Sequence, residues 1–217
     1  LAWSRSLEAD EPAEHEPLFD VAERIDIDQL LLHIDRRTHF LSSFEHVMGR
    51  YQRGRANKPL LVAGLMAFAT KMGLGRMSEI SNFTRDQLST AAANFTRLET
   101  LREANDRLAD ATAKLPIFRY FDIGDTVHSS SDGQKFETEV PTVNSRHSAK
   151  YFGLKKGVIA YTLLASHVPL SARIIGANEH ESHYVFYVLF NNTSDAQPST
   201  HSTDTHGSNQ VNFALLH

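Results

Sequence analysis

The sequence predicts a helical region followed by a region of mixed α/β structure, and three observations lead to that prediction. Hydrophobic residues make up 41% and charged residues 22% of the 217 residues, which is typical of a globular protein. Apolar residues recur at helical spacing from Ile27 to Leu115. After Pro116 the spacing changes to a two-residue period, and β-branched residues become frequent. The class is therefore α/β, or α+β over the whole chain.

Three segments follow from these patterns. Residues 1–20 are acidic and contain proline, and are predicted to be a tail or linker. Residues 21–116 are predicted to form a helical scaffold, and residues 117–217 a separate α/β segment. Because the chain lacks an initiator methionine, we expect it to be a piece of a longer protein.

Within the scaffold, particular residues predict where helices begin and end. Pro59 is expected in the first turn of a helix that ends near Gly73 and Gly75. Thr84 with Gln87 predicts a capping box at the start of another helix. A third, long helix is predicted to end before Pro116. Its expected inner face carries Leu98, Leu101, Leu108 and Leu115.

The second region reads as three strands, a helix, a strand and a helix. The first two strands are predicted over 127–131 and 136–143, with a central apolar strand over 158–166 and a further extended segment over 171–176. Helical spacing returns over 179–190 and 209–216. Between these two helices, residues 200–204 are predicted to form a strand.

The charge is unevenly distributed, although the net charge is only −4. Residues 1–28 hold nine acids and two bases, which leaves 20 bases against 17 acids in the remainder. Basic clusters lie at 36–58 and 146–156, and such clusters either contact phosphates or form solvated faces. The absence of cysteine excludes disulfides and thiolate zinc sites, and no apolar run approaches the roughly 18 residues of a membrane span.

Two short segments place an aspartate beside Ser, Thr and Gly at the edge of a predicted strand. They are Ser129–Gln134, which contains Asp132, and Ser202–Gly207, which contains Asp204. If the strands are neighbours, both carboxylates project from one sheet edge and suit Mg²⁺ or Mn²⁺. Gly133 and Gly207 would then let a substrate backbone approach. On spacing alone, turn or cap sequences remain the competing interpretation.

The histidines around Asp204 raise a further possibility. His201 and His206 flank this aspartate at a spacing that would fit zinc. No third ligand is evident among the hydroxyl-rich neighbours, so oxygen coordination of Mg²⁺ or Mn²⁺ is the favoured interpretation.

Three segments in this order resemble the catalytic region of the Tn3 family of replicative transposases. They are Ser130–Phe136, Asn144–Gly153 and Thr203–Gly207, and the middle one departs from the family at Ala149, where proline is expected. Residues 21–116 resemble the helical segment that precedes the family's catalytic domain. The resemblance implies that residues 117–217 are the first half of a ribonuclease-H-like domain with a DDE triad. Asp132 and Asp204 would be its two aspartates, the metal ligands and catalytic residues, with the third acid, a Glu, beyond position 217.

The resemblance also implies an activity and partners. The parent protein would cleave one strand at each transposon end and transfer the 3′-hydroxyl ends to target DNA in replicative, cointegrate-forming transposition, using Mg²⁺ or Mn²⁺. It would act as a homodimer on bacterial DNA in the cytoplasm. A fragment with two of three acids is expected to be inactive alone. The alternatives are a non-catalytic module for DNA binding or self-association and another ribonuclease-H-like nuclease.

A basic hairpin follows Asp132 and is expected to contact DNA phosphates. Its candidate residues are Arg146, His147, Lys150, Lys155 and Lys156. For His147, packing against Tyr151 is the competing interpretation.

Overall fold

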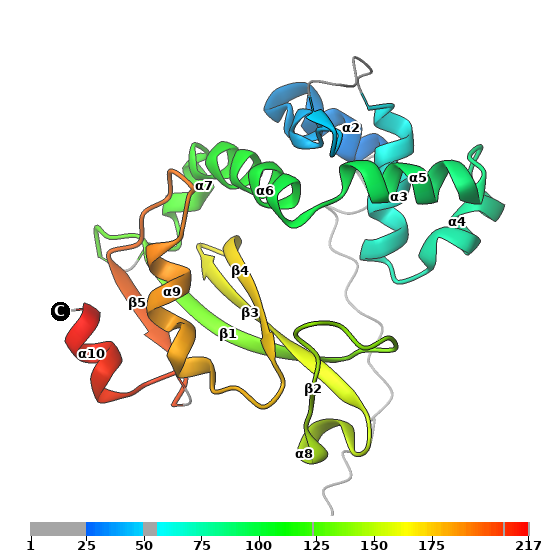
Figure 1. The fold of residues 1–217 in the computed structure, drawn as a ribbon. Coiled ribbons are helices and arrows are strands. Elements are labelled where there is room, and N and C mark those ends of the chain that lie inside the picture. The colour runs from blue at the N-terminus through cyan, green and yellow to red at the C-terminus, as the bar shows by residue number, and fades with distance from the viewer. Residues whose placement is uncertain (1–24, 50–55, 123, 206, 217) are drawn as a thin grey trace, which may run out of the picture.

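The computed structural model describes residues 25–49, 56–122, 124–205 and 207–216, so the predicted tail over 1–20 lies outside the described residues. Helices come first and strands follow, which confirms the α/β class (Figure 1). The first part holds α2 (Ile27–Thr38), η1 (Phe40–Ser43), α3 (Lys58–Ala69), α4 (Gly73–Ile80), α5 (Arg85–Phe95), α6 (Leu98–Ala113) and α7 (Pro116–Arg119). The second holds β1 (His128–Glu137), β2 (Arg146–His147), α8 (Ala149–Phe152), β3 (Lys156–Ala165), β4 (Val168–Gly176), η3 (Glu181–Tyr184), α9 (Val185–Phe190), β5 (Thr200–Thr203) and α10 (Gln210–Leu216).

The helix starts in the first part follow the sequence signals closely. Pro59 lies in the first turn of α3, and the side chain of Thr84 accepts a hydrogen bond from Gln87 N in the predicted capping box. The prediction that Gly73 and Gly75 end α3 was wrong. That helix ends at Ala69, and Gly73 begins α4 with a φ of 76°, a left-handed conformation that reverses the chain between the two helices.

Helix α6 buries only part of the predicted face, since Leu108 is half-buried against a hydrophobic cluster but the other three leucines are exposed. Leu98, Leu101 and Leu115 are 56%, 41% and 50% exposed, and Leu115 lies beyond the end of the helix. The buried side chains are Thr100, Ala104 and Ala109, and the two alanines pack into two separate hydrophobic clusters. Because these side chains are small, the backbone of α6 can lie close to both η1 and β4. Close packing of the helix therefore decides which face is buried, rather than the size of the leucine side chains.

The described residues include one mixed sheet of five strands. Four of them lie in the order β2–β3–β1–β5, and the fifth, β4, also pairs with β3. β1 is antiparallel to β3 and parallel to β5. The prediction of two strands over 127–131 and 136–143 was wrong, because β1 is one continuous strand through Asp132 and Gly133. These two residues pair with Thr162 and Tyr161, so they remain extended. The arrangement is consistent with part of a ribonuclease-H-like domain.

The sheet is covered on one face by α9, which lies in front of it in Figure 1. Ile159, Tyr161 and Leu163 alternate toward this face and pack with Val185 and Val188. Burial of such side chains contributes about 1.5–3 kcal/mol each. The core therefore fixes β3, and through β3 the position of β1.

Two hydrogen bonds connect the loop between α9 and β5 to α6. Asp106 Oδ2 accepts a hydrogen bond from Thr193 Oγ1 at 2.6 Å, and Asp110 Oδ1 accepts one from Asp195 N at 2.7 Å. Burial raises the pKa of the Asp106 carboxyl, and the hydrogen bond from Thr193 opposes that rise. These contacts bring the chain back to the sheet immediately before β5.

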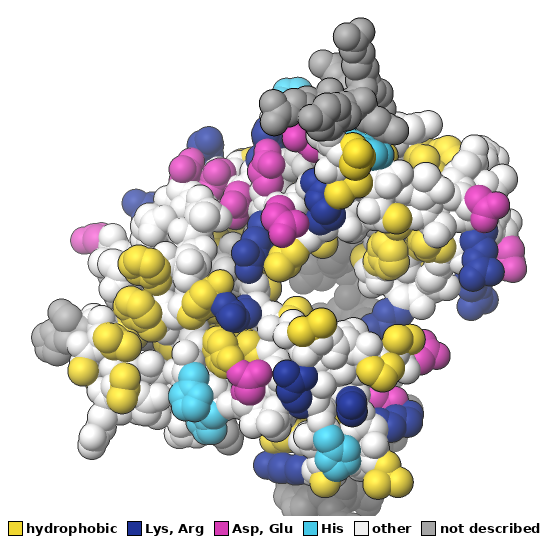
Figure 2. Space-filling model, viewed as in Figure 1, with side chains coloured by type: hydrophobic (Ala, Val, Ile, Leu, Met, Phe, Trp, Pro, Cys, Tyr) yellow, Lys and Arg dark blue, Asp and Glu magenta, His cyan; other side chains and the backbone are white. Residues whose placement is uncertain are grey.

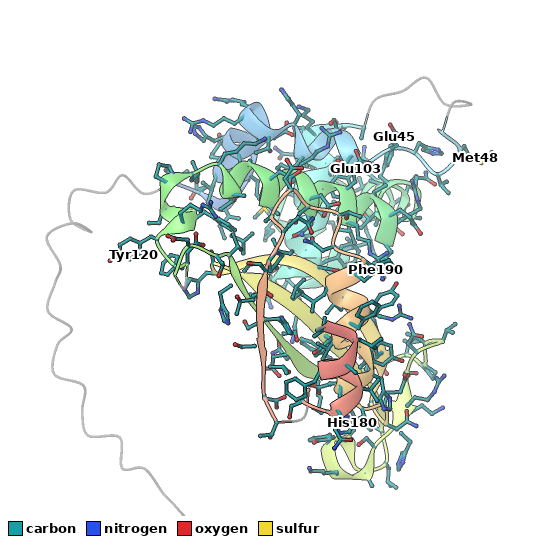
Figure 3. The ribbon with its side chains drawn as sticks, turned by 90° about the vertical axis from the view of Figure 1, so that its left-hand side faces the viewer. Glu45, Met48, Glu103, Tyr120, His180 and Phe190 are labelled. Carbon is teal, nitrogen blue, oxygen red and sulfur yellow. The ribbon has the colours of Figure 1, made fainter. Side chains whose placement is uncertain are left out.

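Hydrophobic side chains gather over α9 and α10 on the left of Figure 2. A cavity of about 720 Å³ lies there, lined by Phe186, Phe190, Val211 and Leu215 among others. Figure 3 shows Phe190 and His180 on this side of the molecule, and Tyr120 projecting into solvent from the end of α7. In the described part of the chain, no helix is long and apolar enough to cross a membrane.

Candidate active site

Asp132 and Asp204 each follow directly after residues that pair two neighbouring parallel strands, β1 and β5. In the register of β1 and β5, Ser130 is opposite Ser202 and Ser131 is opposite Thr203. Each aspartate follows directly after the last of these pairs. Neighbouring strands lie about 4.8 Å apart, so the register places the backbones that lead into the two aspartates side by side. Both residues are exposed.

The backbone around each aspartate differs. Asp132 lies within β1, and its Oδ1 accepts a hydrogen bond from Gly133 N at 2.7 Å. The turn interpretation of Ser129–Gln134 was therefore wrong. Asp204 begins a tight turn after β5, in which its Oδ1 accepts a hydrogen bond from Gly207 N at 3.0 Å. For Asp204, therefore, the turn interpretation is correct, and a residue in this turn can still belong to the site.

Both glycines have packing roles within the chain. A Cβ on Gly207 would lie 1.8 Å from Thr203 Oγ1, and one on Gly133 would lie 2.4 Å from Cδ of Glu181. The close approach that we expected from a substrate backbone is made by the protein's own side chains. A larger residue at either position would have to displace the side chain of Glu181 or Thr203.

Beneath the aspartates, on the face covered by α9, lies a group of connected polar side chains. His201 Nδ1 is 2.9 Å from Ser129 Oγ, and its Nε2 is 3.0 Å from Ser131 Oγ. Ser131 Oγ is also 2.6 Å from the hydroxyl of Tyr161. We call these four residues, Ser129, Ser131, Tyr161 and His201, the serine–histidine network.

Burial sets the charge state of this network. It lowers the pKa of His201, and the nearby His128 lowers it further. Burial also raises the pKa of the Tyr161 hydroxyl, an effect that the hydrogen bond with Ser131 partly opposes. The network is therefore neutral at pH 7.

Sequence reasoning missed Glu181, which is 9% exposed in η3. Its Oε1 accepts a hydrogen bond from Lys135 Nζ at 3.0 Å, and its carboxylate packs beneath Gly133. No pattern of spacing marks this residue, because it reaches β1 from a segment 46 positions away. It lies on the face of β1 opposite that of Asp132, since successive side chains alternate.

The basic residues predicted to contact DNA lie apart from the aspartates. Arg146 in β2 is opposite Gly157, five residues along β3 from Thr162, the partner of Asp132. At about 3.3 Å per residue this is a separation of about 17 Å along the sheet. His147 pairs with Lys156 in the same ladder.

These basic side chains are exposed, but several have partners within the chain. Arg146 Nη1 donates to Val143 O at 2.7 Å, and Lys155 Nζ donates to Glu137 Oε1 at 2.5 Å. That hydrogen bond with Glu137 raises the pKa of Lys155. Lys150 lies over the ring of Tyr151, 5.0 Å from its centroid. They form one basic end of the sheet.

The donor atoms of the two aspartates fit a hard divalent cation in kind. Carboxylates supply the oxygen ligands that Mg²⁺ and Mn²⁺ prefer. Within the described ranges no group of three or more His, Cys, Asp or Glu residues could hold a metal ion. His206, half of the zinc alternative, lies outside the described residues.

The fold and the site define a class: an α/β protein with an aspartate directly after each of two paired residues, Ser131 and Thr203, of neighbouring parallel strands. A family model described as the Tn3 transposase DDE domain matches residues 29–217. This chain belongs to that family.

Relatives with curated names agree. The chain is 32% identical over 195 residues to the transposase for transposon gamma-delta of Escherichia coli (strain K12), covering 88% of this chain and 19% of the relative. It is 30% identical to the transposase for transposon Tn501 of Pseudomonas aeruginosa, covering 89% and 19%. It is 25% identical to the transposase for transposon Tn1546 of Enterococcus faecium, covering 97% and 22%. The chain thus spans about a fifth of these relatives' length.

Proposed function

We propose that this chain is part of a DNA transposase that cleaves transposon ends and joins their 3′-hydroxyl ends to target DNA by replicative transposition. The observation that supports this proposal is the register of β1 and β5, which pairs Ser131 with Thr203, the residues directly before Asp132 and Asp204. Family membership supports it, because the matched model is that of a transposase DDE domain.

In this proposal the carboxylates of Asp132 and Asp204 would be ligands of divalent cations, Mg²⁺ or Mn²⁺. Such cations supply an activated attacking oxygen and stabilise the leaving oxygen of an in-line displacement. The chain contributes by holding Asp132 and Asp204 at fixed positions. Pairing with β3 fixes β1, and pairing with β1 fixes β5.

The chain alone provides an incomplete site. Among the described residues no third carboxylate joins the pair. We therefore infer that the chain by itself is inactive and that a third acid, a Glu expected from the family resemblance, completes the site in the parent protein.

The basic end of the sheet is proposed to bind the DNA duplex away from the reacting phosphate. A separation of about 17 Å along the strands corresponds to about five base-pair steps of 3.4 Å each. Arg146, Lys150, Lys155 and Lys156, with His147 between them, would contact phosphates there without reading sequence. DNA is thus the proposed partner, and a second copy of the parent protein is the proposed assembly partner.

The proposal is tested with Asp132→Asn and Asp204→Asn in the longer transposase that contains this segment. Strand cleavage, strand joining and DNA binding are measured separately, with Asp125→Asn as the control because Asp125 is exposed and precedes β1. We expect both site variants to lose cleavage and joining by at least a hundredfold and to keep DNA binding, whereas the control retains all three.

Retained cleavage in either site variant would overturn the proposal in favour of a non-catalytic DNA-binding or self-association module. Cleavage without joining in the wild-type protein would instead indicate another ribonuclease-H-like nuclease.

A further inference from the structure

The serine–histidine network links the two strands that carry the aspartates. His201 is on β5, three residues before Asp204, whereas Ser129 and Ser131 are on β1, and Ser131 immediately precedes Asp132. The imidazole bridges both serines, at 2.9 Å and 3.0 Å, and so spans two successive inward positions of the neighbouring strand.

The hydrogen bonds assign a direction to this network. Ser129 Oγ donates to Thr200 O at 3.3 Å, so it accepts from Nδ1–H of His201. In a neutral imidazole the other nitrogen, Nε2, must then accept, and Ser131 Oγ is its donor. Ser131 in turn accepts from the hydroxyl of Tyr161, at 2.6 Å. A neutral histidine protonated at Nδ1 satisfies every group in this series.

Side-chain hydrogen bonds to β1 matter for strand β5 because its backbone pairing is short. Only the four residues Thr200–Thr203 pair with β1, and in the described sheet β5 is an edge strand. A slip of one residue would turn every side chain of β5 to the opposite face and displace Asp204 from Asp132. A side chain bonded to two positions of β1 at once resists that slip.

We propose that His201 is a positioning residue, which fixes the register of β5 against β1 and thereby holds Asp204 beside Asp132. The inference rests on the proposed function of the two aspartates. His201 touches neither substrate nor metal in this role and acts through the two serines of β1.

The test compares His201→Leu, which removes both hydrogen bonds, with His201→Gln, which can keep one of them. His33→Leu is the matched control, because His33 is exposed on α2 and far from the sheet. Hydrogen exchange of the Ser202 and Thr203 amides is measured in the 217-residue chain, together with Mn²⁺ affinity by electron paramagnetic resonance. Asp132→Asn and Asp204→Asn identify which Mn²⁺ signal belongs to the pair.

For His201→Leu we expect exchange in β5 to accelerate about tenfold or more, since two hydrogen bonds are lost. We also expect Mn²⁺ affinity to fall about tenfold, the usual consequence of losing a residue that orients a ligand. His201→Gln should be intermediate, and His33→Leu should match the wild type. Nitrogen-15 chemical shifts of the wild-type imidazole should show the proton on Nδ1.

Unchanged exchange in β5 of His201→Leu would overturn the inference, and so would a proton on Nε2. Faster exchange with unchanged Mn²⁺ affinity, in a protein whose affinity depends on Asp132, would overturn the positioning role alone. A wild-type Mn²⁺ affinity that is insensitive to both aspartate variants would instead refute the metal pair of the proposed function, while exchange would still decide whether His201 fixes the register.

Discussion

The Cα of Gly133 lies against the carboxylate of Glu181, with no room for a methyl group between them. A Cβ at position 133 would be 2.4 Å from Cδ and 2.5 Å from Oε1 of that side chain. Glu181 is nearly buried and bonded to Lys135, so it cannot move aside freely. The strand position next to Asp132 is thus set by a side chain from η3.

We expect Gly133→Ala to lower the free energy of unfolding by about 1–3 kcal/mol, the usual range for overpacking. Urea denaturation of the purified chain measures the loss. In the double variant Gly133→Ala/Glu181→Ala the clash is removed, so its loss should be smaller than the sum of the two single losses. Additive losses would show that the contact does not determine the effect.

A buried carboxylate in the helical region provides a second prediction. Asp35 is 2% exposed, accepts a hydrogen bond from Leu41 N at 2.9 Å through Oδ1, and pairs with Lys58 of α3 through Oδ2. Asp35→Ala leaves Leu41 N–H buried without this acceptor and should cost about 2–4 kcal/mol. Lys58→Met should cost about 3–5 kcal/mol, because it leaves the buried Asp35 carboxylate without its counterion. Chemical denaturation of the two variants measures both losses, and a loss below about 1 kcal/mol for Lys58→Met would contradict this account.

The pH dependence of stability should carry a contribution from His201. Burial lowers its pKa in the folded state, so below the unfolded value of about 6.5 the unfolded chain binds the proton more readily. The contribution is fully present above pH 6.5 and is lost as pH falls toward the folded pKa, with a slope of at most about 1.4 kcal/mol per pH unit. Denaturation midpoints at pH 7.5 and pH 5.5 should therefore differ more in the wild type than in His201→Gln. An equal difference in both proteins would exclude this role.

The capping box of α5 can be tested against a substitution of the same type in the same helix. Thr84→Ala removes the acceptor of Gln87 N, a 3.2 Å hydrogen bond, and should lower stability by about 1 kcal/mol. Thr90→Ala, at an exposed position inside α5, should leave it unchanged or raise it slightly, because alanine is the better helix former. Thermal denaturation by circular dichroism distinguishes them.

Local signals predicted the parts of the fold that local interactions decide. The first-turn proline at Pro59, the cap at Thr84 and the strand before Asp204 each depend on residues close in sequence, and all three are confirmed. The break expected within β1 was wrong for the converse reason. Asp132 and Gly133 favour a turn locally, but pairing with Thr162 and Tyr161 of β3 keeps them extended.

The site was predictable only in part. Motifs identified Asp132 and Asp204. Which residues of β1 and β5 pair with one another is shown only by the register in the structure. Neither Glu181 nor the bridge from His201 to the serines could be found in this way. Both depend on which side chains the sheet places on its covered face, and that depends on residues 46 to 72 positions apart.

The parallel pairing of β1 with β5 also determines when the two carboxylates can meet. Seventy-two residues separate Ser129 from His201, and they include β3, β4 and α9. Closing so long a loop is entropically costly, so contacts of this kind form late in folding. A nascent chain leaving the ribosome would expose β1 well before β5 has been synthesised. During translation, therefore, the first aspartate emerges without its partner, and the two carboxylates cannot be brought together until nearly all of this segment has left the exit tunnel.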